Sequence, residues 1–294
     1  MAKYITKFDS IEAYNAAKES LDYPNISLIE GVGLDWQETA PPTPPHDYGN
    51  DYFTFVALED GTFSFSNSGL SYSLDSGITW QTLEGETSTP TIQNGSTVFW
   101  KGELVPPDRG GIGTFSSTGE FDVEGNIMSL VYGDNFIGQT DLTRKDFAFE
   151  NLFLDCWNLI NAENLVLPAT TLSEGCYLTM FEGCSSLTTA PQLSATTLAY
   201  NCYEMMFYGC TSLTTAPELP ATTLVDWCYA SMFAECTSLN KITCLATDIS
   251  ASRCTHNWLD FVATSGVFTK AASMNDWTSG DNGVPIGWSV QDYT

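Results

Sequence analysis

A pattern of apolar positions repeats every 26 residues through the middle of the chain. Three well-matched units carry a leucine, a cysteine, a phenylalanine and a second cysteine in that order, separated by mostly polar residues. The matched positions are Leu172, Leu198 and Leu224; Cys176, Cys202 and Cys228; Phe181, Phe207 and Phe233; and Cys184, Cys210 and Cys236. In a stack of such units each recurring residue packs against its own copies and is buried. A fixed period with recurring leucines therefore predicts a leucine-rich-repeat solenoid, which we place at 141–262.

Residues 50–140 show a different pattern, in which short apolar runs alternate with polar residues between turn signals. The runs 54–56 and 62–65 flank Asp60-Gly61, which is typical of a hairpin turn, and Asn94-Gly95 indicates a second turn. This region is predicted to be an antiparallel, β-sandwich-like domain.

The two ends of the chain complete a multidomain prediction. Residues 1–40 predict a small α+β N-terminal segment, with one strand and one amphipathic helix, and the proline-rich stretch 41–49 predicts a stiff linker. The aromatic stretch 263–294 is expected to form a C-terminal cap, because the exposed end of a solenoid needs covering.

The composition narrows the classes of partner. The chain has 294 residues, 36 of them acidic and 10 basic, for a net charge of −26. Nucleic-acid binding needs clusters of Lys and Arg, so we exclude nucleic acid as a partner. No apolar stretch approaches the length of a membrane span, so no membrane insertion is expected. The first residues lack the apolar segment of a secretory signal, which favours synthesis without export.

The nine cysteines follow the repeat period rather than a metal-site spacing. Zinc sites usually contain closer pairs, and disulfides are rare in a reducing compartment. Cysteine is among the most frequently buried residues, so we favour buried free thiols over zinc ligation or disulfides. No metal ligand or cofactor site is predicted.

Candidate catalytic residues are few. Ser73-Leu74-Asp75-Ser76-Gly77-Ile78-Thr79-Trp80 matches the S-x-D-x-G-x-T-W pattern known as the Asp-box, which predicts a structural hairpin turn. The two histidines, His46 and His256, lie in the linker and near the cap, and neither indicates a nucleophile–base pair. Catalysis is therefore not expected, although a glycan-cleaving enzyme remains a competing class.

The positions that differ between repeat units give a candidate binding surface, because residues outside the repeated core should face solvent. They include Glu174, Tyr200 and Asp226 at one position, Trp227 at the next, and Tyr208 at a third. Exposed aromatic rings beside carboxylates suit sugar or protein binding. Ordinary packing of the rings over neighbouring units is the alternative.

The run L-P-A-T-T-L-x3-C-Y-x2-M-F-x-G-C-[ST]-S-L-T-T-A-P resembles the BspA-type leucine-rich repeats of gut Bacteroides and of phages that infect them. Glu235 departs from this pattern, since it stands where Gly183 and Gly209 occur in the earlier units. The resemblance implies surface recognition without enzyme activity. The opening segment 1–28 resembles the attachment segment of Bacteroides-phage virion proteins.

Together with the missing export signal, the resemblance predicts a virion surface protein, a head or tail fibre or decoration. Residues 1–40 would bind other virion proteins, and the repeats would face a glycan or protein on the host surface. Such fibres are often trimeric, so the resemblance also implies a homotrimer. The alternative is a BspA-like adhesin on a bacterial cell surface.

Overall fold

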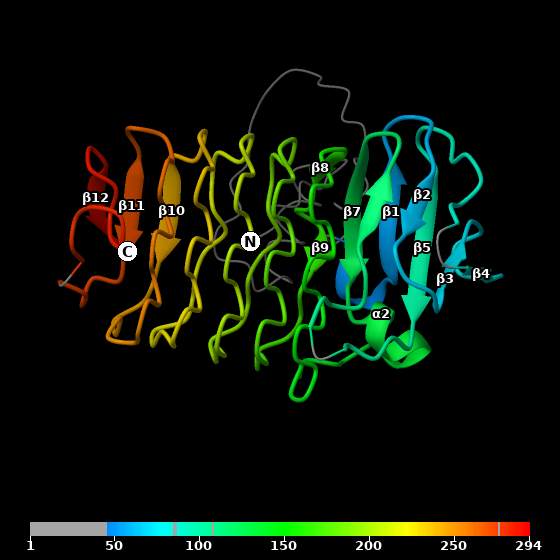
Figure 1. Ribbon diagram of the computed structural model, residues 1–294, viewed down its shortest axis with the longest axis horizontal. Helices are drawn as coiled ribbons and strands as arrows, with labels where there is room; N and C mark the ends of the chain where they lie inside the picture. Colours follow the sequence, from blue (N-terminus) through cyan, green and yellow to red (C-terminus); the bar gives the residue numbers. More distant parts are fainter. Residues whose placement is uncertain (1–45, 85–86, 108, 276) are drawn as a thin grey trace, which may run out of the picture. The chain divides into compact units, whose positions relative to one another are not determined.

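The computed structural model describes residues 46–84, 87–107, 109–275 and 277–294 (Figure 1). Residues 47–294 form one compact unit. The predicted α+β segment at 1–40 and most of the predicted linker lie outside the described residues. The described part of the chain contains no helix with the length and apolar character needed to cross a bilayer.

The predicted fold class, a β-sandwich-like domain followed by a leucine-rich-repeat solenoid, is wrong. Strands contain 26% of the residues and helices contain 4%. The described residues form several sheets and no closed solenoid. The sheets have seven, three and two strands. Two features explain the difference: the β region and the repeats share one sheet and one core, and proline interrupts the strands of the repeats.

The elements follow in chain order. They are η1 (Tyr48–Asn50), β1 (Phe53–Ala57), β2 (Phe63–Phe65), β3 (Leu70–Ser73), β4 (Gln81–Leu83), β5 (Thr97–Gly102), β6 (Phe115–Ser117), β7 (Phe121–Asn126), α2 (Ser129–Tyr132), η2 (Gly133–Asn135), β8 (Leu159–Asn161), β9 (Leu165–Val166), β10 (Lys241–Cys244), β11 (Val267–Lys270) and β12 (Ser289–Asp292). The seven-stranded sheet runs β4-β3-β5-β1-β7-β8, and β9 also pairs with β7.

The hairpin predicted around Asp60-Gly61 is wrong, because β1 and β2 belong to different sheets. β1 lies between β5 and β7, antiparallel to both, whereas β2 pairs with β6. The amide of Gly61 donates to the carbonyl of Ile92, so the chain turns a corner between the sheets instead of folding back on itself. The turn predicted at Asn94-Gly95 is confirmed, with a φ of +78° at Gly95.

The β region continues directly into the repeats. β7 pairs in parallel with β8 and β9, which belong to the first, poorer unit. On the opposite side, the amide of Phe115 donates to Leu152 O at 2.8 Å. The ring of Phe153 lies 5.9 to 6.1 Å from the rings of Phe53, Phe55 and Phe115. The aromatic core of the β region is therefore the first layer of the repeat stack.

One side of the stack extends the sheet, but mostly through isolated bridges. The bridges pair Leu167 with Leu193 and Thr171 with Thr197, in parallel. Pro191, Pro217 and Pro220 lie in this side, and proline has no amide hydrogen to donate to a neighbouring strand. In the next unit the equivalent stretch, 239–250, contains no proline. The regular strand β10 forms there and pairs with β11.

The other side of the stack consists of five segments, 145–156, 173–184, 199–210, 225–236 and 251–262, which we name the turn ladder. Its amides alternate between two kinds of partner. Tyr177 N donates across to Cys202 O of the next unit at 3.1 Å, whereas Met180 N donates back to Tyr177 O at 3.3 Å. The same alternation recurs along the segments from Phe147 to Cys236. No α-helix forms here because every second amide is bonded to another unit.

The turn ladder requires a left-handed backbone at regular intervals. At one recurring position φ lies between +51° and +53°, in Thr179, Met205, Ser231 and Asn257. Non-glycine residues adopt this region at a cost of about 1 to 2 kcal/mol each. Gly175 also has a positive φ, and a Cβ there would overlap the ring of Phe147. The hydrogen bonds between units hold the non-glycine residues, such as Thr179 and Met205, in this left-handed conformation.

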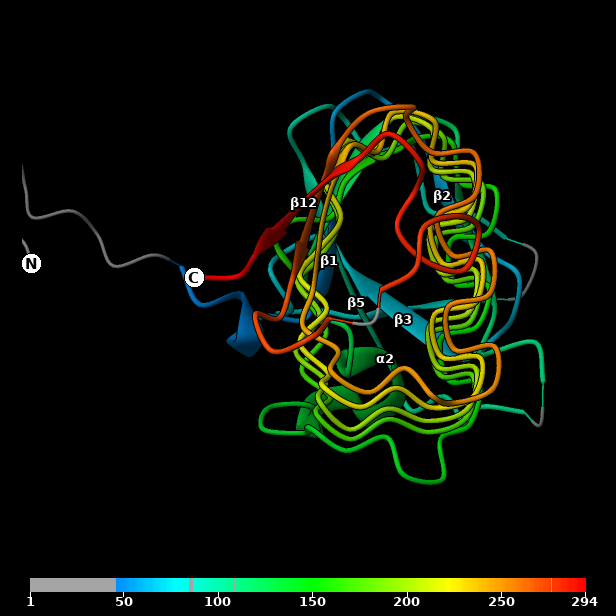
Figure 2. The same ribbon diagram turned by 90° about the vertical axis from the view of Figure 1, so that its left-hand side faces the viewer.

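Rows of stacked rings run along the interior, as the repeat pattern predicted. Phe153, Phe181, Phe207 and Phe233 stack with centroids 5.3 to 5.4 Å apart and planes within 9° of parallel. Figure 2 looks along the stack and shows successive units overlying one another. A second row contains Phe149, Tyr177, Tyr203, Tyr229, Trp258 and Trp277. The predicted burial of Leu172, Leu198 and Leu224 is confirmed.

The prediction that the cysteines are buried free thiols is confirmed for all nine. Cys210 Sγ donates to Phe181 O at 3.1 Å, and Cys184 and Cys236 make the equivalent contact with Phe153 and Phe207. Burial raises the pKa of the Cys176 thiol to about 12. Among the described residues there is no group of three or more His, Cys, Asp or Glu side chains arranged to hold a metal ion.

We expect Phe207→Ala to lower the free energy of unfolding by about 3 to 5 kcal/mol, because it leaves a cavity in the middle of a ring stack. The matched control is Phe261→Ala, since Phe261 is 70% exposed. That variant should change the free energy by about 0.5 kcal/mol or less. Guanidinium unfolding followed by tryptophan fluorescence measures both, and equal losses would contradict the assignment of Phe207 to the stabilising row.

Candidate functional site

The Asp-box motif forms the structural turn that its sequence predicts. Asp75 Oδ1 accepts from the amide of Thr79 at 2.8 Å, and Asp75 Oδ2 accepts from the Thr79 hydroxyl at 2.6 Å. Gly77 has a φ of +82°, and Trp80 Nε1 donates to its carbonyl at 3.0 Å. These hydroxyl and amide bonds lower the pKa of Asp75 to about 2. The polar groups of the motif are used within the turn.

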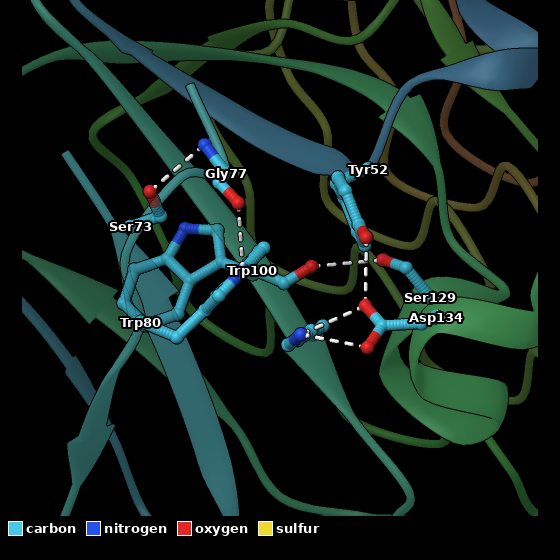
Figure 3. Close-up of polar contacts among 8 residues, drawn as sticks. Tyr52, Ser73, Gly77, Trp80, Trp100, Ser129 and Asp134 are labelled. Atoms are coloured by element: carbon cyan, nitrogen blue, oxygen red, sulfur yellow. Dashed lines mark hydrogen bonds and ion pairs between the residues drawn. The ribbon is translucent and has the colours of Figure 1, made fainter. Parts of the chain in front are cut away.

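A compact cluster lies beside this turn (Figure 3). Asp134 accepts from the Tyr52 hydroxyl at 2.7 Å and forms an ion pair with Lys101 Nζ at 2.7 Å. The hydrogen bonds from Lys101 and Tyr52 lower the pKa of Asp134. Lys101 Nζ also lies 4.2 Å from the centre of the Trp80 ring. Lys101 therefore covers one face of the Trp80 ring and pairs with the Asp134 carboxylate, so neither group is open to a ligand. The cluster holds the turn against β5.

The turn ladder carries all five binding residues predicted from the variable positions. Backbone bonds between units place Glu174, Tyr200, Asp226 and Ser252 in one row, since Gly175 N donates to Tyr200 O and Asn201 N to Asp226 O. Hydrogen-bonded neighbours in such a row lie about 4.8 Å apart. Trp227 belongs to the adjacent row, and Tyr208 to a row farther along the segment.

The predicted residues differ in exposure. Tyr200 is 44% exposed and Asp226 is exposed, whereas Glu174, Tyr208 and Trp227 are partly buried. The Tyr208 hydroxyl donates to Glu235, and this bond raises the pKa of Tyr208 to about 12. Tyr208 is therefore engaged within the protein, and the open part of the surface lies around Tyr200 and Asp226.

Two residues that the sequence did not reveal complete this surface. The Arg253 guanidinium lies 4.7 Å from the centre of the Trp227 ring, and the His256 ring meets Trp227 edge-on at 6.1 Å. Trp227 N donates to Ser252 O, which places Arg253 beside Trp227 in the next unit. The 26-residue separation of Trp227 and Arg253 could have predicted that they are neighbours in adjacent units. The repeat pattern is weak in the last unit, so this equivalence was not recognised.

Comparison of the chain with family models, with curated proteins and with solved structures finds no match.

We predict that Asp75 stays ionised down to a pH of about 2, because its pKa is lowered to about 2. Its contribution to stability is present above the ordinary pKa of 3.8 and is lost as the pH falls through about 2. Carboxyl ¹³C NMR across an acid titration measures this pKa. Thr79→Val should raise it by removing the hydroxyl donor, while Thr79→Ser should leave it unchanged. A wild-type Asp75 pKa near 3.8 would contradict the turn geometry.

Proposed function

We propose that this chain is a non-enzymatic binding protein whose turn ladder recognises a glycan on a host-cell surface. The observation that carries the proposal is the exposed Tyr200 ring beside the Asp226 carboxylate, at positions where the otherwise repetitive units differ. A tyrosine ring stacks on the apolar face of a sugar, and a carboxylate oxygen accepts bonds from its hydroxyls. The two residues belong to adjacent units, about 4.8 Å apart.

Rigidity of the backbone supports this proposal. The segments that present Tyr200 and Asp226 are bonded to their neighbours through alternate amides, and buried rings and thiols fill the space beneath them. A preorganised surface loses little conformational entropy when a ligand binds. Side chains on such a scaffold can be exchanged without disturbing the core, which suits recognition of differing surfaces.

For the location, we propose the surface of a phage particle. This part of the proposal rests on the resemblance of the repeats to BspA-type repeats, which occur in gut Bacteroides and their phages. Residues 1–40 would bind other virion proteins, and the homotrimer remains a prediction. A bacterial surface adhesin is the competing function, because the same repeats occur there.

We expect Tyr200→Ala to weaken retention of the labelled protein on gut Bacteroides cells by roughly tenfold or more, because a central aromatic contact is lost. Its melting temperature should not change, since the ring is 44% exposed. Tyr293→Ala is the matched control: Tyr293 is 45% exposed and follows β12, outside the turn ladder. Equal effects of the two variants on retention, or a lower melting temperature for Tyr200→Ala alone, would refute a binding role for Tyr200.

Peptide mass spectrometry on density-purified phage particles, and separately on host envelope fractions from the same culture, tests the location. Stoichiometric recovery with the particles is the expected result. Recovery only in the envelope would replace the virion proposal with the adhesin. Loss of viscosity when the pure protein is incubated with host polysaccharide would overturn the non-enzymatic part.

A further inference from the structure

The last unit of the turn ladder contains a hollow next to the proposed glycan surface. Its lining includes the side chains of Arg253 and His256, the apolar residues Ile249 and Ala251, and Asn282 from the C-terminal stretch. The hollow adjoins Trp227, on which both Arg253 and His256 pack. The hollow therefore places the Arg253 cation and the apolar side chains of Ile249 and Ala251 next to the surface around Tyr200 and Asp226.

Arg253 has no carboxylate partner among the described residues. In that part of the chain, the ion pairs involve Lys101 with Asp134 and Lys270 with Asp292. Asp226, the acid adjoining Trp227 in sequence, accepts instead from the amide of Ser252 at 2.8 Å. Arg109 packs on the ring of Phe147 in the same way, at 4.9 Å and without an ion pair among the described residues, so what distinguishes Arg253 is the hollow that it lines.

Asn282 is held through its two oxygen atoms, and no hydrogen bond from its side-chain nitrogen Nδ2 forms among the described residues. Its Oδ1 accepts from the amide of Asn257 at 3.0 Å, and its carbonyl accepts from the Thr255 hydroxyl at 2.8 Å. With Oδ1 held in this way, the side-chain NH₂ group still has hydrogens to donate. Arg253 and Asn282 thus bring two kinds of donor to the same hollow.

We propose that this hollow binds the carboxylate of an acidic sugar, so that the glycan recognised by the chain is a uronate or a related carboxylated saccharide. This proposal rests on the glycan-binding function proposed above. The planar guanidinium fork matches a carboxylate in two parallel hydrogen bonds. The apolar side chains of Ile249 and Ala251 suit the C–H face of the sugar ring.

A carboxylate fits the charges better than a phosphate does. Binding a dianion normally draws on several cations, and here a single arginine faces a protein of net charge −26. A sugar carboxylate carries a single negative charge, which the one guanidinium can neutralise through two hydrogen bonds. The hydroxyl groups of the sugar ring also give the neighbouring acceptor Asp226 a partner.

The test uses ¹⁵N NMR of the arginine side chains in the full chain, which contains only Arg109, Arg144 and Arg253. Each Nε–H gives one signal, and three Arg→Gln variants assign them. Titration with galacturonate should shift the Arg253 signal to saturation, leave Arg144 unchanged, and lose its effect in Arg253→Gln. Galactose should shift none of them. An Arg253 signal that does not move, that moves equally with galactose, or that moves more with inorganic phosphate would overturn the proposal.

Binding measurements separate this proposal from the general one. Affinity for oligogalacturonate should fall by about tenfold or more in Arg253→Gln, because a charge-assisted hydrogen bond is lost. Arg144→Gln is the matched control, since Arg144 is also an exposed arginine with a positive φ. If Arg253→Gln leaves this affinity unchanged while Tyr200→Ala reduces retention on cells, the acid-sugar proposal fails and glycan binding stands. If Tyr200→Ala has no effect while Arg253→Gln does, glycan recognition through Tyr200 fails instead.

Discussion

In the turn ladder, successive amides alternate between a partner in the same unit and a partner in the next unit, and this alternation holds the repeats together. Every second amide closes a turn within its own unit, and the next one donates to the unit beyond. A unit by itself would leave half of these donors unpaired, and an unpaired buried amide is costly. The left-handed residues, such as Ser231, are tolerated only because the neighbouring units fix the backbone. Each unit is therefore stable only within the stack.

The same constraint explains why the β region and the repeats form one body. The first unit needs partners on both sides, and the β region supplies them through β7 and through the segment at Phe115. Phe153 then continues the aromatic core of the β region into the phenylalanine row. At the other end, Trp277 covers the ring of Trp258, while β12 is left exposed at the edge of its sheet.

The basic side chains on the surface differ in whether they have an ion-pair partner. Lys101 is bound to Asp134 and packed on Trp80, so the Asp-box cluster has no free cation. Arg253 packs on a ring without an ion-pair partner in the described part of the chain. Arg109 packs on Phe147 in the same way, so it is the hollow beside Arg253, with Asn282 as a second donor, that makes this place favourable for a ligand's negative charge in a protein of net charge −26. The carboxylate of the ligand is therefore placed at Arg253, in the last unit of the turn ladder, and not at the cluster around Lys101 on β5.

The burial of the recurring residues in the repeats and the local turn of the Asp-box could both be predicted from the sequence. A 26-residue repetition gives Phe207 and Cys210 the same surroundings as their copies, so their burial could be predicted without knowing the backbone. The Asp-box turn could be predicted because the atoms that stabilise it lie within a few residues of Asp75. Three features could not be predicted from the sequence: the turn ladder, the joining of the β region to the repeats, and the contact between Trp227 and Arg253. In each of these the deciding partner lies in another unit or strand, and no local pattern records which partner a backbone amide or a guanidinium will find.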